Sequence, residues 1–397
     1  ADVCDLQNGF AFKSKDYIDS SNTLNIRMSN IRPNGDFNPD HNPRFLPDSY
    51  TEEYQSFLLY EGDLVIAMTD MAGEPKILGL PTLVGNLNGR SFLMNQRVGK
   101  LFDFSDDIYI PYLRYYLSSP IIKEYYKSKG AGGLQINISK KDVLSAEIPL
   151  PPIPEQRRIV ELLDSVFADL EKTRAKTEQN LKNARELFDS CLQQAFCSKD
   201  RSWVNNKLGD VCNIVGGGTP SKSNDSFYGG NIPWATVRDM RNDILTSTQL
   251  SITEDAVKQS STNLIPSGAI ITATRVGLGK VCILNQDTAI NQDLKAFIPK
   301  DEKLDNTFLY WWLKSIAHII VSAGTGATVQ GVKLTFVKSL DIPLPLIPEQ
   351  NIIASKLSVL SENKAQLERL YQNKLLAIDE LKKSILQKAF SGELTHD

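Results

Sequence analysis

The sequence predicts an α+β protein made of two tandem mixed modules, each followed by one long helix. Three observations support this fold class. A nine-residue stretch, IPLPPIPEQ at 148–156, returns as IPLPLIPEQ at 342–350, an offset of 194 positions. About forty helix-compatible residues follow each copy, and similar strand and turn patterns precede each copy. The chain of 397 residues is also too long for one ordinary core, so two or more domains are expected.

The segments after the proline turns have apolar residues in alternating steps of three and four, which is the seam of a coiled coil. Neither segment contains an internal Pro or Gly, so each predicts one helix of roughly 60 Å at about 1.5 Å per residue. A stutter falls at Thr177, and the polar seam residues Thr173, Thr177 and Lys364 either fix the register or are tolerated mismatches. The apolar seam residues are Ile159, Leu163, Leu170, Leu181, Phe188, Ile353, Leu357, Leu367, Leu375, Ile378 and Ile385.

The two seams are expected to bury each other within one chain. The connection from the first helix into the second module, 198–207, is short, whereas a parallel pair needs a return of tens of ångströms. The helices are therefore predicted to pack as an antiparallel coiled coil with pseudo-twofold symmetry. Each proline turn then fixes the angle between a module and its helix.

The repeat sets the domain boundaries. The first module is expected at 1–150, its helix at 151–199, the second module at 200–344 and the second helix at 345–397. Strands are expected near 63–68 and 269–274, and helices near 109–128 and 305–322. The aromatic pairs Tyr115-Tyr116 and Trp311-Trp312 lie in the expected helices, where core packing is favoured over base stacking.

Composition and charge exclude several classes of protein. No run of about 18 apolar residues is present, so a membrane span is not expected. The five cysteines form no CxxC pair, which favours reduced thiols in a cytoplasm, and the three histidines lack metal-ligand spacing. The net charge of −3 argues against simple non-specific nucleic-acid binding, which needs a basic surface.

The chain resembles the specificity subunits of type I restriction–modification systems over essentially its whole length. The resemblance is carried by the IPLPxIPEQ turns, the two helices, the ending LQKAFSGELT (386–395), and the module entries NGFAFKSKDY (8–17) and VGGGTPSKS (215–223). The second module has a lead-in at 202–212, whereas the matching Asp2-Val3-Cys4 stands at the start of the sequence, so the first module is expected to be trimmed.

The resemblance implies a function without catalysis. Each module would be a target recognition domain that reads half of a bipartite, asymmetric sequence in double-stranded DNA. The helices would separate the two readers and dock two methyltransferase subunits, and restriction subunits would join through that complex. No cofactor is expected on this chain, because S-adenosylmethionine belongs to the methyltransferase subunit, and the methylated base is expected to be adenine.

Polar and basic residues in loops are the candidate DNA contacts, because Arg suits guanine edges and Asn or Gln suits adenine edges. Each of them also has the ordinary interpretation of a solvated side chain or a turn cap. The candidates are Arg27, Asn30, Arg32, Lys76, Arg90, Asn95, Gln96 and Arg97 in the first module, and Lys222, Arg238, Arg241, Arg275, Lys280, Asn291, Gln292 and Lys295 in the second.

Two glycine-rich stretches, GAGGLQ (130–135) and GTGATVQ (324–330), follow the late helix of each module. They are expected to stop those helices, and the alternative is a backbone nest that holds a phosphate.

An enzyme and a scaffold are the competing interpretations. The Pro-Pro pair lies in the hinge, no cofactor-binding glycine turn has a βαβ context, and a P-loop is absent. Asp48 with Glu74 and Lys76 loosely resembles a nuclease site in one module alone, and paired carboxylates of the glycosidase type stay open. A coiled-coil scaffold with two β-rich ligand-binding modules not specific for DNA is the remaining alternative.

Overall fold

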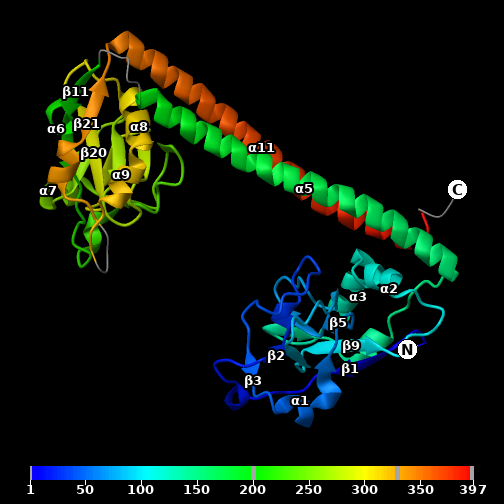
Figure 1. Ribbon diagram of the computed structural model, residues 1–397. Helices are drawn as coiled ribbons and strands as arrows, with labels where there is room; N and C mark the ends of the chain where they lie inside the picture. Colours follow the sequence, from blue (N-terminus) through cyan, green and yellow to red (C-terminus); the bar gives the residue numbers. More distant parts are fainter. Residues whose placement is uncertain (1, 198–202, 327–330, 394–397) are drawn as a thin grey trace. The chain divides into compact units, whose positions relative to one another are not determined.

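The chain divides into two compact units, each of which combines one module with parts of both long helices. The structure is a computed structural model and describes residues 2–197, 203–326 and 331–393 (Figure 1). Unit 1 comprises Ala1–Thr177 and Asn373–Asp397, and unit 2 comprises Glu178–Gln372. Each unit is α+β, in agreement with the fold class that the sequence predicts.

The first module contains two four-stranded sheets and a small two-stranded sheet. The main sheet has the order β1 (Asp5–Asn8), β9 (Val98–Phe102), β5 (Leu64–Ala67) and β7 (Pro81–Leu83), and is antiparallel throughout. The second sheet has the order β3 (Phe45–Leu46), β2 (Thr23–Ile26), β8 (Ser91–Met94) and β4 (Leu58–Leu59), with β2 and β8 parallel. Strand β6 (Thr69–Met71) pairs with β10 (Gln135–Asn137). The helices are α1 (Tyr50–Glu53), α2 (Ile110–Leu117), α3 (Pro120–Lys129) and α4 (Lys140–Leu144).

The second module repeats this plan. Its main sheet has the order β12 (Cys212–Gly216), β20 (Leu294–Pro299), β17 (Ile270–Ala273), β18 (Val281–Leu284) and β14 (Ile244–Leu245). Its second sheet has the order β15 (Leu250–Ile252), β13 (Tyr228–Ala235), β19 (Thr288–Ile290) and β16 (Asn263–Ile265), again with a parallel central pair. Strand β11 (Val204–Lys207) pairs with β21 (Asp341–Leu344) at the second proline turn. The helices are α6 (Leu208–Val211), α7 (Glu254–Gln259), α8 (Asn306–Ser315), α9 (Ala317–Ser322) and α10 (Leu334–Ser339).

The main sheet of each module is buried on both faces. In β5, Leu64 and Ile66 face the helices, while Val65 and Ala67 face the second sheet. This alternation follows from the two-residue period of a strand, and it explains why the expected strand is apolar at every position. Each module therefore has three layers: helices, main sheet and second sheet.

The helices expected at 109–128 and 305–322 are each broken into two. In the first module the Ser119 hydroxyl caps α3 and Pro120 occupies its first helical position, which suits proline because that N–H lacks an intrahelical partner. In the second module the break falls at Ile316. Tyr116, Trp311 and Trp312 are buried in the cores, as core packing requires.

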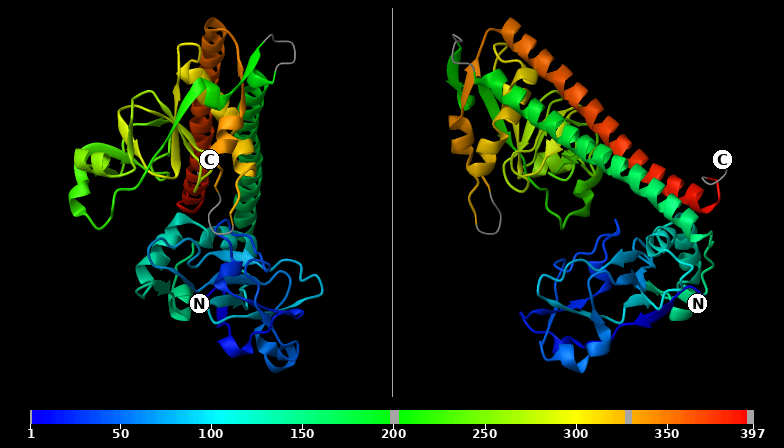
Figure 2. Two further views of the ribbon diagram at one scale, coloured as in Figure 1. Left: turned by 90° about the vertical axis from the view of Figure 1, so that its left-hand side faces the viewer. Right: turned by 45° about the vertical axis from the view of Figure 1, so that its right-hand side comes forward.

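The long helices α5 (Ile153–Phe196) and α11 (Ile347–Phe390) lie side by side in both views of Figure 2 and run antiparallel. In unit 1, Arg174 pairs with Asp379, and the Lys382 Nζ lies 3.3 Å from a Glu171 carboxylate oxygen. In unit 2, the Arg185 Nε lies 2.6 Å from a Glu368 carboxylate oxygen. In each unit the residue numbers rise along one helix as they fall along the other, which confirms the predicted antiparallel direction.

The predicted seam is most deeply buried near the modules. Ile159, Leu163, Phe188, Ile353, Leu357 and Ile378 are buried, Leu170, Leu181, Leu375 and Ile385 are half-buried, and Leu367 is exposed. The buried Thr177 hydroxyl donates to the Thr173 carbonyl, so this polar seam residue is satisfied within its own helix. The ammonium of Lys364 lies 4.5 Å from the centre of the Phe188 ring, where a cation–π contact is favourable.

Each module packs against the start of one long helix and the end of the other. In unit 1 the ring of Phe390, at the end of α11, meets Tyr112 edge to face with centroids 5.3 Å apart. In unit 2 the ring of Phe196, at the end of α5, meets Phe308 in the same way at 5.3 Å. The end of α11 thus packs on the first module, and the end of α5 packs on the second module. Each core therefore contains residues of both long helices, which requires the antiparallel pairing.

The last residue of the repeated nonapeptide locks each proline turn to its module. The Gln156 side-chain nitrogen donates to the carbonyls of Asp107 and Pro151, both at 2.8 Å, and its oxygen accepts from the Tyr109 N–H at 2.8 Å. Gln156 is fully buried, so these bonds form in a region without competing water.

The second copy makes the same bonds. The Gln350 nitrogen donates to the carbonyls of Lys303 (2.8 Å) and Pro345 (2.9 Å), and its oxygen accepts from the Asp305 N–H at 2.9 Å. One amide therefore joins the turn, the first helical turn of α11 and the loop before α8. This is the physical reason for the repetition of the nonapeptide.

Replacing Gln350 with Leu is expected to lower the free energy of unfolding of unit 2 by about 3 kcal/mol, because it leaves one buried and two partly buried backbone groups unpaired. All four tryptophans lie in unit 2, so tryptophan fluorescence during urea denaturation reports on this unit alone. Gln366→Leu, at an exposed position of the same helix, is the matched control and should change stability by less than about 0.5 kcal/mol. Equal urea midpoints for the two variants would contradict the role of Gln350.

Candidate nucleic-acid interface

Asn95, Gln96 and Arg97 lie together at one end of the main sheet of the first module, where β5 ends and β9 begins. Asn95 is buried, and its side-chain oxygen accepts from the Arg97 N–H at 3.2 Å, which folds 95–97 into a tight turn. The turn leaves the Gln96 side chain exposed and that of Arg97 half-exposed. The Met68 N–H donates to the Arg97 carbonyl at 2.9 Å, which joins the turn to the end of β5.

The second module builds the same turn with the same Asn-Gln pair but with Asp293 in place of Arg97. The Asn291 side-chain oxygen accepts from the Asp293 N–H at 3.2 Å, and Gln292 is exposed. The Thr274 N–H donates to the Asp293 carbonyl at 2.9 Å, as Met68 does in the first module. The Thr219 hydroxyl donates to the Gln292 side-chain oxygen, so this amide is held in place.

A glycine allows the first strand of each module to pass against this turn. A Cβ at Gly9 would lie 2.2 Å from the Asn95 carbonyl oxygen, and a Cβ at Gly217 would lie 2.1 Å from the Ile290 carbonyl oxygen. No side chain fits at either position, so the close approach needs glycine.

The glycine-rich stretches close hairpins beside the turns. Ala131 and Asn137 exchange two backbone hydrogen bonds of 3.1 and 3.0 Å, and Thr325 and Gly331 exchange two of the same lengths, 194 positions later. The chain ends α3 at Gly130 with φ −58°, so the left-handed stop typical of glycine is absent there. Residues 327–330 of the second stretch lie outside the described residues.

These hairpins are hydrogen-bonded to the same strand end as the turns. The Ile138 N–H donates to the Met68 carbonyl at 3.0 Å, and the Val332 N–H donates to the Thr274 carbonyl at 2.9 Å. In each module one residue therefore has the Asn-Gln turn on its N–H side and the hairpin on its carbonyl side. We call this combination of turn, strand end and hairpin the recognition end.

The other candidate contacts of the first module differ in how exposed their side chains are and in how many hydrogen bonds they already make. Asn30 is buried, and its side chain bonds to backbone groups of its own loop. Its oxygen accepts from the Arg27 N–H at 2.8 Å, and its nitrogen donates to the Asn38 carbonyl at 3.0 Å. Arg27 and Arg32 are half-buried and donate to carbonyls of their own loops, and burial lowers the pKa of the Arg27 guanidinium. Lys76 is exposed, with Glu74 4.0 Å away.

Arg90 lies at the opposite end of β8 from the Asn-Gln turn. Its guanidinium lies 2.6 Å from an Asp40 carboxylate oxygen and also over the Phe92 ring. Asn30, Asn95 and Asn291 thus shape loops, and Arg90 is separate from the recognition end.

Four of the eight second-module candidates, Arg275, Asn291, Gln292 and Lys295, lie at its recognition end. The Arg275 guanidinium lies 3.7 Å from an Asp293 carboxylate oxygen, and the Lys295 ammonium lies 3.5 Å from the Gln292 carbonyl. Burial lowers the pKa of Lys295. Lys222 and Arg238 are exposed in loops before and after β13.

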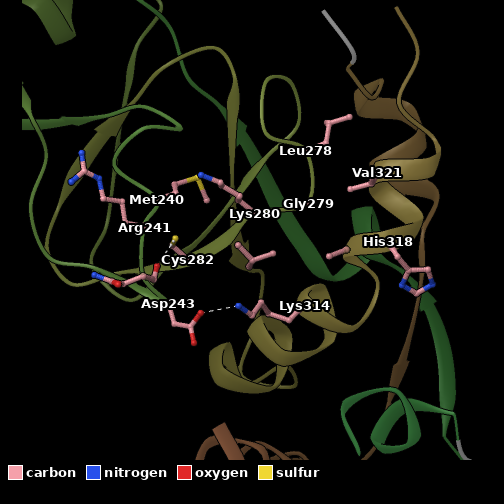
Figure 3. A pocket seen from close by; sticks show the side chains of 13 residues that line it. Met240, Arg241, Asp243, Leu278, Gly279, Lys280, Cys282, Lys314, His318 and Val321 are labelled. Atoms are coloured by element: carbon pink, nitrogen blue, oxygen red, sulfur yellow. Dashed lines mark hydrogen bonds and ion pairs between the residues drawn. The ribbon is translucent and has the colours of Figure 1, made fainter. Parts of the chain in front are cut away.

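Arg241 and Lys280 line a hollow of about 450 Å³ between the β14–β18 edge and α9 (Figure 3). Inside it, the Lys314 ammonium lies 2.7 Å from an Asp243 carboxylate oxygen, so these two charges largely cancel. Cys282 also lines the hollow, and burial raises the pKa of its thiol to about 11, which keeps the thiol neutral. The hollow therefore offers cationic side chains rather than a nucleophile.

The residues of the loose nuclease-like match are engaged separately. Asp48 accepts from the Thr23 hydroxyl at 2.8 Å and from the Asn22 N–H at 3.1 Å, while Glu74 is exposed beside Lys76. In the described part of the chain, no three His, Cys, Asp or Glu side chains form a group that could hold a metal ion. No helix among the described residues is long and apolar enough to cross a bilayer.

Sequence reasoning missed the strand ends Met68 and Thr274 and the hairpins that they join to the turns. A signal was available, because Gly130 and Gly132 recur as Gly324 and Gly326 at the same offset of 194 as the proline turns. The chemistry of the recognition end is that of a binding surface. Amide and guanidinium groups can contact base edges, and nearby ammonium groups can contact phosphates.

Comparisons with known proteins agree with this arrangement. The model of the type I restriction modification DNA specificity domain matches residues 1–179 and again 200–377. The MjaIX specificity subunit of Methanocaldococcus jannaschii is 32% identical over 44% of this chain and 41% of its own length. The EcoR124I/EcoR124II specificity subunit of Escherichia coli is 33% identical over 55% of each chain. These two alignments thus span about half the length of the curated relatives.

A solved structure described as showing complex assembly and conformational transition of the type I R-M system has the same fold. It matches with a TM-score of 0.76 and 20% identity, over 98% of this chain and 95% of that one. Two domain matches that together cover most of the sequence show the family: the chain belongs to the type I restriction–modification DNA specificity family, with one copy of its domain at 1–179 and another at 200–377.

Proposed function

We propose that this specificity subunit reads a bipartite, asymmetric sequence in double-stranded DNA, with one half-site for each module. The observation that carries the proposal is the recognition end, which occurs in both modules on the same backbone frame with different side chains. Arg97 in the first module stands where Asp293 stands in the second, and Met68 stands where Thr274 stands. The same backbone arrangement with some different contact side chains suits two half-sites that differ in base sequence.

Gln96 and Gln292 are the proposed base readers. Each side chain is exposed at the tip of a turn whose backbone is fixed by a buried asparagine, so little backbone freedom is lost on contact. A Gln amide can bond to both N6 and N7 of adenine in the major groove. Arg97 can bond to O6 and N7 of guanine, whereas Asp293 can accept from cytosine N4.

The basic candidates are proposed to contact phosphates. Lys76, Lys222, Arg238, Arg241, Arg275, Lys280 and Lys295 are exposed or half-exposed in loops of the two modules. With a net charge of −3 the chain supplies little general attraction for DNA, so the proposal assigns much of the phosphate contact to partner subunits.

The helix pair is proposed to space the modules and to dock two methyltransferase subunits, with restriction subunits joining through them. The relatives named above are subunits of type I restriction enzymes, which supports partners of this kind. The methyltransferase subunit would bind S-adenosylmethionine and methylate adenine, so this chain contributes recognition without catalysis.

Removing the gene is expected to abolish adenine methylation at one two-part motif, which methylome sequencing of the source cell detects. Complementation with Gln96→Ala should relax the base requirement in one half of the motif only. Complementation with Gln292→Ala should relax it in the other half only. Loss of a paired base contact costs about 1–3 kcal/mol, or roughly 5- to 150-fold in discrimination. Each variant controls for the other. An unchanged methylome, or one variant that alters both halves, would contradict the proposal.

The complex is expected to contain two methyltransferase subunits for each copy of this chain. Each unit combines the first turns of one long helix with the last turns of the other, so the same kind of docking surface occurs twice. Native mass spectrometry of the reconstituted complex measures the ratio directly. Saturation at one methyltransferase subunit would show that only one of the two surfaces is used.

A further inference from the structure

The tip of the first hairpin presents a leucine to solvent. Leu134 is 87% exposed, more than any other large apolar side chain in the described residues. A lone exposed leucine is normal on a protein surface, so the surroundings of Leu134 decide what it can contact. The neighbouring strand adds Met71, which is 54% exposed and lies opposite Gln135 in the β6–β10 pair.

The backbone holds this leucine in a fixed place. The hairpin is closed by the two Ala131–Asn137 hydrogen bonds, and the Leu134 carbonyl accepts from the Ala72 N–H at 3.1 Å. Gly132 has φ +138°, and a Cβ there would lie 1.9 Å from the Gln135 carbonyl oxygen. The tip is therefore a tight, glycine-dependent structure that projects one apolar side chain.

The hairpin belongs to the recognition end of the first module. The Met68 backbone bonds to Arg97 on one side and to Ile138, which directly follows β10, on the other. The Leu134 tip and the proposed base reader Gln96 are thus held by the same strand end.

The charge around the hairpin suits a polyanion. The segment 123–141 contains five lysines and one acidic residue, Glu124, although the whole chain has a net charge of −3. Lys127, Lys129 and Lys141 are exposed on either side of the hairpin in the sequence. The equivalent segment of the second module, 317–335, contains one lysine and no acidic residue, so this feature is specific to the first module.

We propose that Leu134 enters the DNA as an apolar wedge between two stacked base pairs in the half-site of the first module, with Met71 covering its flank. This inference rests on the proposed function and adds DNA deformation to it. Leu and Met are among the side chains that unstack a base step and kink the duplex, by roughly 20–90°. The lysines neutralise the phosphates that approach each other around such a kink.

The test uses the full chain in complex with its methyltransferase subunits on the target duplex found by methylome sequencing. 2-Aminopurine replaces each adenine in turn within and next to the half-site that Gln96→Ala relaxes, apart from the methylated adenine, because a methyltransferase takes its target base out of the stack. The wild-type complex should raise fluorescence at one step by about threefold or more, because unstacking relieves quenching. Leu134→Ser should lose most of that rise, and Leu134→Met should keep it.

Leu83→Ser is the matched control. Leu83 is also an exposed leucine on the first module, but it pairs with Leu64 at the start of β5, the opposite end of the main sheet. This variant should leave the fluorescence rise unchanged. Because Leu134 is almost fully exposed, its serine variant should fold as the wild type does.

Three outcomes would overturn the wedge. The rise could persist in Leu134→Ser, no step could become unstacked in the wild-type complex, or Leu134→Ser could instead weaken methyltransferase binding without DNA, which would place the leucine against a protein. In all three cases methylation of a two-part motif would still stand as evidence for the proposed function. Absence of any such motif would instead remove the proposed function.

Discussion

A buried glutamine amide at the start of each long helix determines how the rest of the chain is arranged. Gln156 and Gln350 each satisfy three backbone groups from the proline turn and from the loop that leads into α2 or α8. Breaking these bonds would leave peptide groups unpaired in an apolar core, so the module and the first helical turn behave as one rigid body.

The far end of each long helix is also held in place, because it packs in the core of a module. Phe390 completes the core beside Tyr112, and Phe196 completes the core beside Phe308. Each module therefore lacks part of its core until the other helix arrives, which couples the folding of the two halves. This coupling suits the proposed reading of two half-sites, because neither module is complete without a helix that also belongs to the other.

How much the sequence could reveal depended on which features repeat. The proline turns and the antiparallel helices were predictable because a period and an offset of 194 mark them, and the aromatic pairs were predictable because they recur at an offset of 196. The recognition end was only partly predictable. Asn95 and Gln96 stood out as a repeated pair, but nothing local in the sequence indicates that Asn95 is buried as a turn former while Gln96 points outward. The Met68 and Ile138 bond joins residues 70 positions apart, and such tertiary pairing has no periodic signature.

The charges across the helix pair explain why α5 selects α11. Positions 174 and 368 are equivalent in the repeat, and so are positions 185 and 379. In unit 1 position 174 pairs with 379, and in unit 2 position 185 pairs with 368. Helix α5 carries Arg at both of its positions, whereas α11 carries Glu368 and Asp379. Two copies of α5 would place Arg174 opposite Arg185, and two copies of α11 would oppose two carboxylates. Each exposed pair contributes only about 0.2–1 kcal/mol, but both of these contacts become repulsive in the wrong pairing. The helices thus disfavour symmetric association of like halves and favour the pairing that keeps two different readers together.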